Sequence, residues 1–261
     1  LLLERSNGGI PSSILRTVTP AAPDAWMTAL SNYGTMSLEQ VIAPALEICE
    51  NGFVVQGVLT HFLPQMKDRI ESSPGLREIF MPDGRLVQEG DVLVQKNLGR
   101  TFRRLIDVER THSQEGRAQA VTAARDYFYK GDIAKEISDF IQSNGGLLTY
   151  DDMANFSVKI EAPEKGQYRD YEVYTCGPWC QGPAFIEVLN ILEGYDLREM
   201  GHNSINYVHA IAESIKLAFS DRHYYFGDPE FIPVPLKGLL SKEYADERRT
   251  SLNMEVAFPE M

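Results

Sequence analysis

The chain has 261 residues, 43% hydrophobic and 24% charged, a balance typical of globular proteins. Its 37 acidic residues outnumber its 25 basic ones, and the formal net charge of −12 argues against binding to nucleic-acid phosphates. No apolar run approaches the roughly 20 residues of a membrane-spanning helix, and three cysteines do not make a disulfide framework in a chain of this length. Localisation is left open, because the sequence does not begin with methionine.

Helical patterns dominate the first 150 residues. Ser37 followed three residues later by Gln40 is a capping box, and Asn51 with Gly52 marks the end of the helix that it opens. Apolar periodicity and turn residues predict further helices at residues 26–33, 56–71, 91–110, 117–130 and 133–143.

The pattern changes near residue 150. Thr149 with Asp152 opens a short helical turn. Residues 156–162 alternate between apolar and polar side chains, as residues 171–176 do, so we expect two strands that pair across the turn at residues 163–170. Two more helices are predicted at residues 183–194 and 204–226.

The long helix at residues 204–226 carries an apolar face. We expect this face to be buried in the core, with Asp221 and Arg222 in structural roles; its residues are Val208, Ile211, Ile215 and Phe219. His209 and Glu213 lie four residues apart on the same helix. Without a second helical histidine, a satisfied polar pair is expected there in place of a metal site.

No linker or repeat interrupts the chain. We therefore expect a single α+β domain over residues 1–261, helical over residues 20–150, with a small β component and long helices over residues 150–250.

The segment Cys176–Cys180 has the sequence CGPWC. Three residues separate the cysteines where a CxxC redox motif has two, and the following helix can begin only near Pro183, so the spacing argues against redox chemistry. Two thiols without a nearby histidine pair also fall short of a zinc site. A strand end that turns into a helix is the expected role. No set of residues in the chain assembles a nucleophile, a base and an oxyanion hole.

Several segments together resemble, in order, the large-subunit portion of the γ-glutamyltranspeptidase family. They cover nearly the whole chain apart from a variable stretch around residues 75–115, and the ordered set is specific. The segments are TVTPAAPDAWMTALSNYGTMSLEQVIAPALEICENGFVV, FYKGDIAKEISDFIQSNGGLLTYDDMANF, the QGP turn with LNILEGYDL, AIAESIKLAFSDRHYYFGDPEF and LLSKEYADERR.

The resemblance implies the mainly helical part of an N-terminal-nucleophile (Ntn) hydrolase αββα sandwich, completed by a second subunit. Such an enzyme cleaves its own precursor, and the threonine that then heads the small subunit attacks an amide carbonyl while its free amine acts as base. The acyl group passes to water or to an amine. That threonine is expected beyond Arg249 and outside this chain, since Thr250 lacks the family's context, so no catalytic residue is assigned here and no cofactor or metal is expected.

Two segments depart from the family pattern. The arginine segment that binds the substrate carboxylate would precede Leu1, and Glu4 with Arg5 does not reproduce it. Transpeptidases carry Pro-Pro-Ser-Ser-Gly-Gly where this chain has GPWCQGP, which resembles the acylase-like branch. The candidate substrate-cleft residues in this turn are Trp179, Cys180 and Gln181.

Three functions follow. The first is the large subunit of an enzyme that cleaves γ-glutamyl amides, with the small subunit and a small-molecule substrate as partners. The second is a cephalosporin-acylase-like amidase with another acyl substrate. The third is a non-catalytic helical scaffold.

Overall fold

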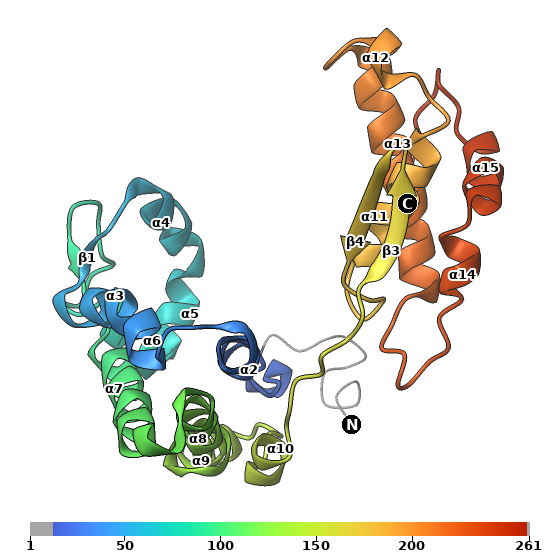
Figure 1. The fold of residues 1–261 in the computed structure, drawn as a ribbon. Coiled ribbons are helices and arrows are strands. Elements are labelled where there is room, and N and C mark those ends of the chain that lie inside the picture. Colours follow the sequence, from blue (N-terminus) through green and yellow to red (C-terminus); the bar gives the residue numbers. More distant parts are fainter. Residues whose placement is uncertain (1–12, 260–261) are drawn as a thin grey trace. The chain divides into compact units, whose positions relative to one another are not determined.

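The computed structural model describes residues 13–259, which group into two compact units divided between Lys159 and Ile160 (Figure 1). Glu4 and Arg5 lie outside the described residues. The expectation of a mainly helical chain with a small β component is confirmed, whereas a single domain over residues 1–261 stays a prediction. Within the described ranges, no helix has the length and apolar character needed to cross a membrane.

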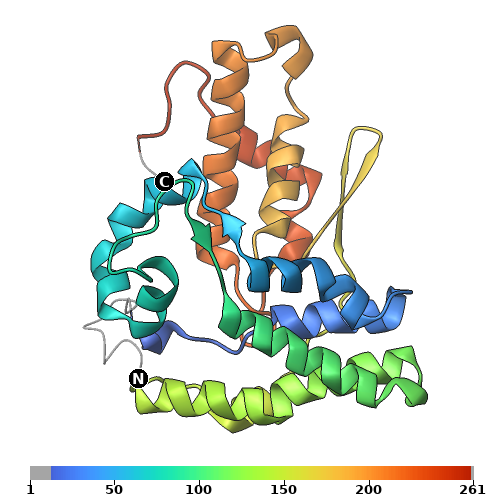
Figure 2. The same ribbon diagram turned by 90° about the vertical axis from the view of Figure 1, so that its left-hand side faces the viewer.

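The first unit is built from helices around one main core. α8 packs against α2, α7 and α9, and α3 packs against α7 (Figures 1 and 2). Most of the core side chains come from α8 and α9, among them the fully buried Tyr129. The helices are α2 (Ala22–Tyr33), α3 (Leu38–Asn51), α7 (Lys96–Thr111), α8 (Arg117–Lys130), α9 (Asp132–Ser143) and α10 (Tyr150–Ala154).

Local sequence signals position several of these helices. Ser37 Oγ accepts a hydrogen bond from the Gln40 N–H at 3.1 Å, and the Gln40 side chain accepts one from the Ser37 N–H at 2.9 Å, so the predicted capping box is confirmed. The second capping box, between Thr149 and Asp152, opens α10 as predicted. The helix predicted at residues 117–130 is α8.

A smaller second core lies in the same unit. Its buried members are Val55, Leu63, Ile70, Val87 and Leu93. The helix predicted at residues 56–71 is broken, because Pro64 lies in the 3₁₀ turn η2 (Leu63–Met66). This core is enclosed by β1 (Phe53–Val54), its antiparallel partner β2 (Val92–Leu93), α4 (Gly57–Phe62), α5 (Lys67–Ser72) and α6 (Pro74–Phe80).

A buried ion pair joins α2 to α8. The Asp24 carboxylate accepts two hydrogen bonds from the Arg125 guanidinium, each 2.9 Å long, and a third from the Thr28 hydroxyl at 3.1 Å. It also accepts the Val158 N–H at 2.8 Å, while Arg125 donates to the Phe156 carbonyl. The ion pair therefore holds residues 156–158, near the end of the first unit, against α2 and α8.

The predicted strand at residues 156–162 is wrong. Backbone groups of Phe156 and Val158 are already bound by Arg125 and Asp24, so they are not available to a β ladder. The strand lies further along the chain at β3 (Glu164–Tyr168), within the stretch predicted to be a turn.

The second unit opens with a hairpin of β3 and β4 (Tyr171–Thr175). Tyr168 pairs with Tyr171, so only Arg169 and Asp170 form the turn, and Arg169 takes a positive φ of 52°. Gly166 made this segment resemble a turn in the sequence. In the structure, the glycine is required because β3 packs closely against the following helix. A Cβ at this position would lie 2.4 Å from the Ile186 side chain of α11 (Gly182–Leu192).

Helix α11 is the centre of the second unit. It packs against the hairpin, against α13 (Ile205–Tyr225) and against α15 (Lys242–Thr250), and Figure 2 shows α11 and α13 side by side. Ile191, Leu217 and Ala245 form the shared core of the three helices. Two short helices complete the unit, α12 (Leu197–Met200) and α14 (Leu236–Leu239).

The predicted core face of α13 is wrong. Val208 is 53% exposed and Ile215 is 40% exposed, whereas the opposite face is buried. That buried face consists of Ala210, Glu213, Ser214, Leu217, Ala218 and Asp221. Small side chains let α13 approach α11 closely, and on the predicted face Ile211 and Phe219 are only half-buried within the second unit.

Candidate functional site

A tight turn links the hairpin of the second unit to α11. The chain leaves β4 at Thr175, and the Cys180 N–H donates to the Gly177 carbonyl at 3.2 Å. Gly182 then begins the helix, with Pro183 in its first turn. A Cβ on Gly182 would lie 2.1 Å from the Cys176 carbonyl oxygen, so only glycine permits this close return of the backbone.

The three candidate cleft residues lie together in this turn. Trp179 is 55% exposed, and its indole Nε1–H donates to Glu161 Oε2 at 2.9 Å. Gln181 is exposed and precedes α11 without a side-chain cap, and Cys180 is half-buried. The side chains could therefore contact a molecule bound at this surface, and their role in a substrate cleft stays a prediction.

In the second unit, ionisable side chains from α11, α13 and α15 form a largely buried cluster. Glu187 is 3% exposed, and neither of its carboxyl oxygens has a hydrogen-bond partner among the described residues. Arg248 Nε lies 3.0 Å from Asp221 Oδ2, although the two groups are not aligned for a hydrogen bond. Arg248 also donates to the Leu217 carbonyl at 3.2 Å. The one guanidinium of the cluster is thus engaged with Asp221 and not with Glu187.

Burial dominates the titration of this cluster. It raises the pKa of Glu187 to about 8, the nearby Asp221 carboxylate adds to the rise, and Arg248 opposes it. Burial likewise raises the pKa of Asp221 and that of Tyr244, the latter to about 12. Glu187 is therefore mainly protonated and neutral at pH 7.

Sequence reasoning missed Glu187, although a signal was present. It is the one charged residue inside the apolar helix GPAFIEVLNIL. An unpaired acid in such a helix is rarely buried without a consequence for its pKa.

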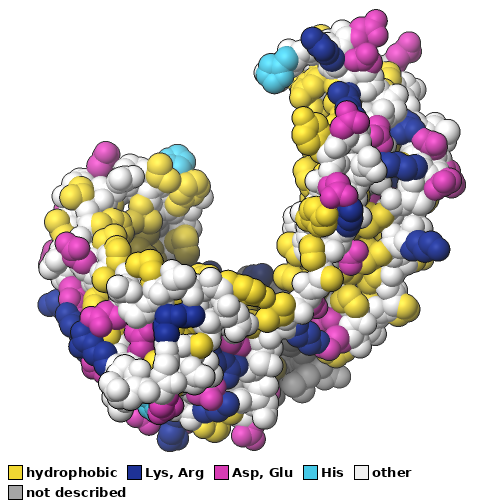
Figure 3. Space-filling view, in the orientation of Figure 1, with side chains coloured by type: hydrophobic (Ala, Val, Ile, Leu, Met, Phe, Trp, Pro, Cys, Tyr) yellow, Lys and Arg dark blue, Asp and Glu magenta, His cyan; other side chains and the backbone are white. Residues whose placement is uncertain are grey.

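An apolar strip of exposed and half-buried side chains runs along one face of α13, and we call it the α13 stripe. Ile205 is 88% exposed, and Figure 3 shows hydrophobic side chains gathered along one side of the second unit. The spacing of three and four residues places its members on one helical face; they are Ile205, Val208, Ala212, Ile215 and Phe219. An apolar strip of this kind is characteristic of a protein–protein contact.

His209 and Glu213, which lie on the same helix, both have structural partners. His209 Nε2 lies 2.8 Å from the Asn253 carbonyl, and Glu213 accepts bonds from Lys216 Nζ at 2.7 Å and from the Phe258 N–H at 2.9 Å. No group of three or more potential metal ligands occurs within residues 13–259.

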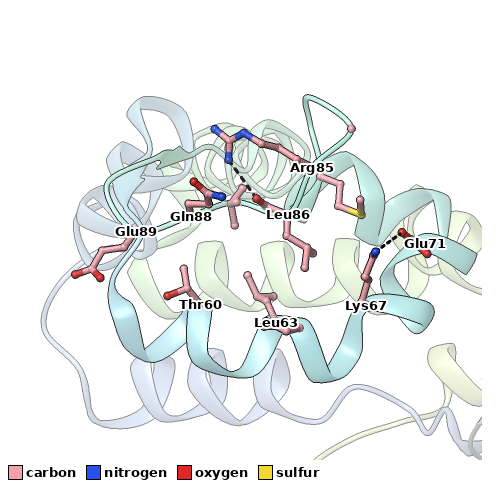
Figure 4. A pocket seen from close by; sticks show the side chains of 12 residues that line it. Thr60, Leu63, Lys67, Glu71, Arg85, Leu86, Gln88 and Glu89 are labelled. Carbon is pink, nitrogen blue, oxygen red and sulfur yellow. Dashed lines mark hydrogen bonds and ion pairs between the residues drawn. The ribbon is translucent and has the colours of Figure 1, made fainter.

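A separate surface pocket of about 580 Å³ lies over the second core of the first unit (Figure 4). Leu63 and Leu86 line it, with Lys67 and Arg85 beside them. Both basic groups are engaged, Lys67 with Glu71 at 3.7 Å and Arg85 with Asp91 at 2.6 Å. Because these charges are already neutralised and exposed, the pocket does not form an anion site.

Comparison with known proteins gives a consistent result. The Gamma-glutamyltranspeptidase family model matches residues 6–261. The chain is 35% identical over 239 residues to the Acylase ACY 1 proenzyme of Pseudomonas sp. (strain SE83), covering 91% of this chain and 40% of that protein. It is also 35% identical over 228 residues to the Glutathione hydrolase proenzyme of Bacillus subtilis (strain 168), covering 87% and 36%.

A solved structure agrees with the sequence comparison. The crystal structure of Helicobacter pylori γ-glutamyltranspeptidase superposes with a TM-score of 0.84 at 28% identity, over 97% of this chain and 70% of that one. The chain thus spans about 40% of the length of the two curated relatives. With the family model matched from residue 6 to the last residue, the chain belongs to the γ-glutamyltranspeptidase family.

Proposed function

We propose that this chain is the large-subunit part of a self-processing Ntn amidohydrolase or transferase that cleaves γ-glutamyl amide bonds. The match of residues 6–261 to the family carries this proposal. Two relatives at 35% identity are named as proenzymes, which supports a precursor cut into subunits. The threonine nucleophile would lie on the small subunit, whose segment is not part of this sequence.

The test is to express the complete protein and to assay it with a γ-glutamyl anilide. We expect two fragments on a denaturing gel, a threonine at the N-terminus of the smaller one, and release of the aniline. Replacing that threonine by alanine should abolish both processing and turnover, because hydroxyl and amine belong to the same residue. A protein that stays in one piece and turns over no amide would instead favour the helical scaffold.

An acylase-like activity is the second candidate, and the GPWCQGP turn favours it. The relative named as an acylase is as similar to this chain as the one named as a glutathione hydrolase. A glutaryl amide assayed beside the γ-glutamyl anilide separates the two activities. If only the glutaryl amide is cleaved, the γ-glutamyl assignment is wrong while the amidase assignment stands.

The α13 stripe fits this proposal as a contact surface for the small subunit. Ile205, Val208 and Ile215 are large, apolar and exposed on the second unit, and a second subunit would remove them from water. The turn with Trp179, Cys180 and Gln181 lies in the same unit and would supply part of the substrate cleft.

Replacing Val208 by glutamate should weaken association of the processed subunits by at least tenfold, because a carboxylate would enter a desolvated contact. Analytical size-exclusion chromatography over a dilution series measures the dissociation. The matched control is Asn206→Glu, an exposed position on another face of α13. If the two variants dissociate alike, the stripe is not the contact surface.

A further inference from the structure

We propose that Cys176 and Cys180 form a reversible intramolecular disulfide that locks the turn between β4 and α11. The spacing of the two residues speaks against CxxC catalysis, and no such catalysis is involved here. The turn is a site where the protein's own thiols are oxidised and reduced. The proposal holds whichever acyl group the enzyme accepts.

The backbone of the turn brings the two cysteines together. The hydrogen bond from the Cys180 N–H to the Gly177 carbonyl, at 3.2 Å, closes a four-residue reversal, and Cys176 immediately precedes it. Gly182 returns close to the Cys176 carbonyl, since a Cβ on Gly182 would lie 2.1 Å from that oxygen, so residues 176–182 form a compact loop. Both ends of the potential ring are therefore held by the fold.

Both thiols are accessible, and they lie at the two ends of the segment that the turn closes. The pKa of the Cys176 thiol is raised, and the largest cause is its hydrogen bond with the Cys180 thiol. Cys176 is exposed and Cys180 is partly exposed, whereas the third cysteine, Cys49, is buried in the other unit. No third ligand accompanies the pair among the described residues, so a dithiol–disulfide couple suits them better than a metal.

The oxidant would be a small disulfide. One protein thiolate attacks a sulfur of the reagent, releases one small thiol and forms a mixed disulfide; the second protein thiolate attacks the protein sulfur and releases the other small thiol. Two protein thiols thereby lose two protons and two electrons, which reduce the reagent disulfide to two thiols. A disulfide closing so short and exposed a ring should be easily reduced again.

Trp179 lies between the two cysteines in the sequence, so its fluorescence can report closure of the disulfide ring. Its indole lies over Gly177, since a Cβ there would lie 3.3 Å from Trp179 Cδ1 and Nε1, and its N–H binds Glu161. Closing the ring should shift the emission of this tryptophan. The shift should be absent in Trp179→Phe, in which only tryptophans outside the ring remain to emit.

The experiment treats the complete protein with 2-hydroxyethyl disulfide, which has no γ-glutamyl group for the proposed enzyme to consume. Peptide mapping by mass spectrometry should show the peptide with Cys176 and Cys180 lighter by two hydrogen atoms, without a reagent adduct, and restored by dithiothreitol. Cys176→Ser and Cys180→Ser should each retain one reagent adduct, showing that both thiols are reached. A wild-type protein that keeps an adduct, or whose two thiols remain free at saturating reagent, would overturn the proposal.

Discussion

Replacing Asp24 by alanine is expected to lower the local free energy of unfolding of the first unit by about 3–5 kcal/mol, the cost of leaving a buried charge unpaired. The Arg125 side chain is 12% exposed and the Asp24 side chain 3% exposed, so the guanidinium would be left largely buried without its main partner. The Val158 N–H and the Thr28 hydroxyl would lose their acceptor as well. Hydrogen exchange of peptides from α2 and α8 measures the effect.

The chain offers a matched control for this change. Arg125 also contacts Asp126 at 2.8 Å, but the Asp126 side chain is 43% exposed. Asp126→Ala removes a partner of the same arginine at the surface and should cost less than about 1 kcal/mol. Combining Asp24→Ala with Arg125→Met should recover stability relative to Asp24→Ala alone, since no buried charge then remains. Equal losses in Asp24→Ala and Asp126→Ala would contradict the buried-charge explanation.

The pH dependence of this ion pair follows from the direction of the pKa shift. Burial alone would raise the pKa of Asp24, but hydrogen bonds from Arg125 and Val158 outweigh it and leave the pKa below its ordinary value of 3.8. The contribution to stability is therefore present above that value. It is lost as the pH falls through the lower pKa of the folded state.

Features coded within a few residues could be predicted from the sequence. The capping boxes at Ser37 and Thr149 and the helix at residues 117–130 depend on neighbours along the chain, and the structure has all three. The strand at residues 156–162 failed because its backbone is bound by Asp24 and Arg125, partners more than 30 residues away for Phe156 and 134 for Val158. No local pattern contains that information.

The error on α13 has a different cause. Apolar periodicity identifies a face that avoids water, and the prediction assumed that this chain alone would cover it. The face toward α11 is instead built from small side chains such as Ala210, Ser214 and Ala218. Under the proposed function the periodicity was informative, but about a contact between subunits and not about the core of this chain.

The candidate site was predictable only in part. The turn carrying Trp179, Cys180 and Gln181 was identified from its Gly-Pro steps, whereas the buried cluster around Glu187 was not. Its members lie on three helices and are more than 25 residues apart along the chain, so only packing brings Glu187, Asp221 and Arg248 together.

Glu187 should make the second unit less stable as the pH rises. Its pKa in the folded state is about 8 against an ordinary value of 4.5, so the folded protein holds a proton that the unfolded chain releases. Stability from this group is complete below about pH 4.5 and declines until the pH has passed about 8. The difference between these two pKa values corresponds to a loss of unfolding free energy of at most roughly 4–5 kcal/mol.

Glu187→Gln tests this directly, because it keeps the shape of the side chain and removes its titration. The amide is as buried as the neutral acid, so its cost is the same at every pH. We expect the melting temperature of the complete protein carrying Glu187→Gln to diverge upward from wild type between pH 5 and pH 8.5. Exposed Glu247 on α15 gives the control, and Glu247→Gln should melt in parallel with wild type over this range.

The groups facing Glu187 decide how the result is interpreted. Asp221 from α13 and Arg248 from α15 are the charged groups that act on it, and burial also raises the pKa of Asp221. If Arg248 turned toward Glu187, the carboxylate would be stabilised and the two melting curves would run parallel. A divergence that grows with pH instead requires that Arg248 stay with Asp221, 3.0 Å away, and that Glu187 remain a neutral acid inside the helix bundle.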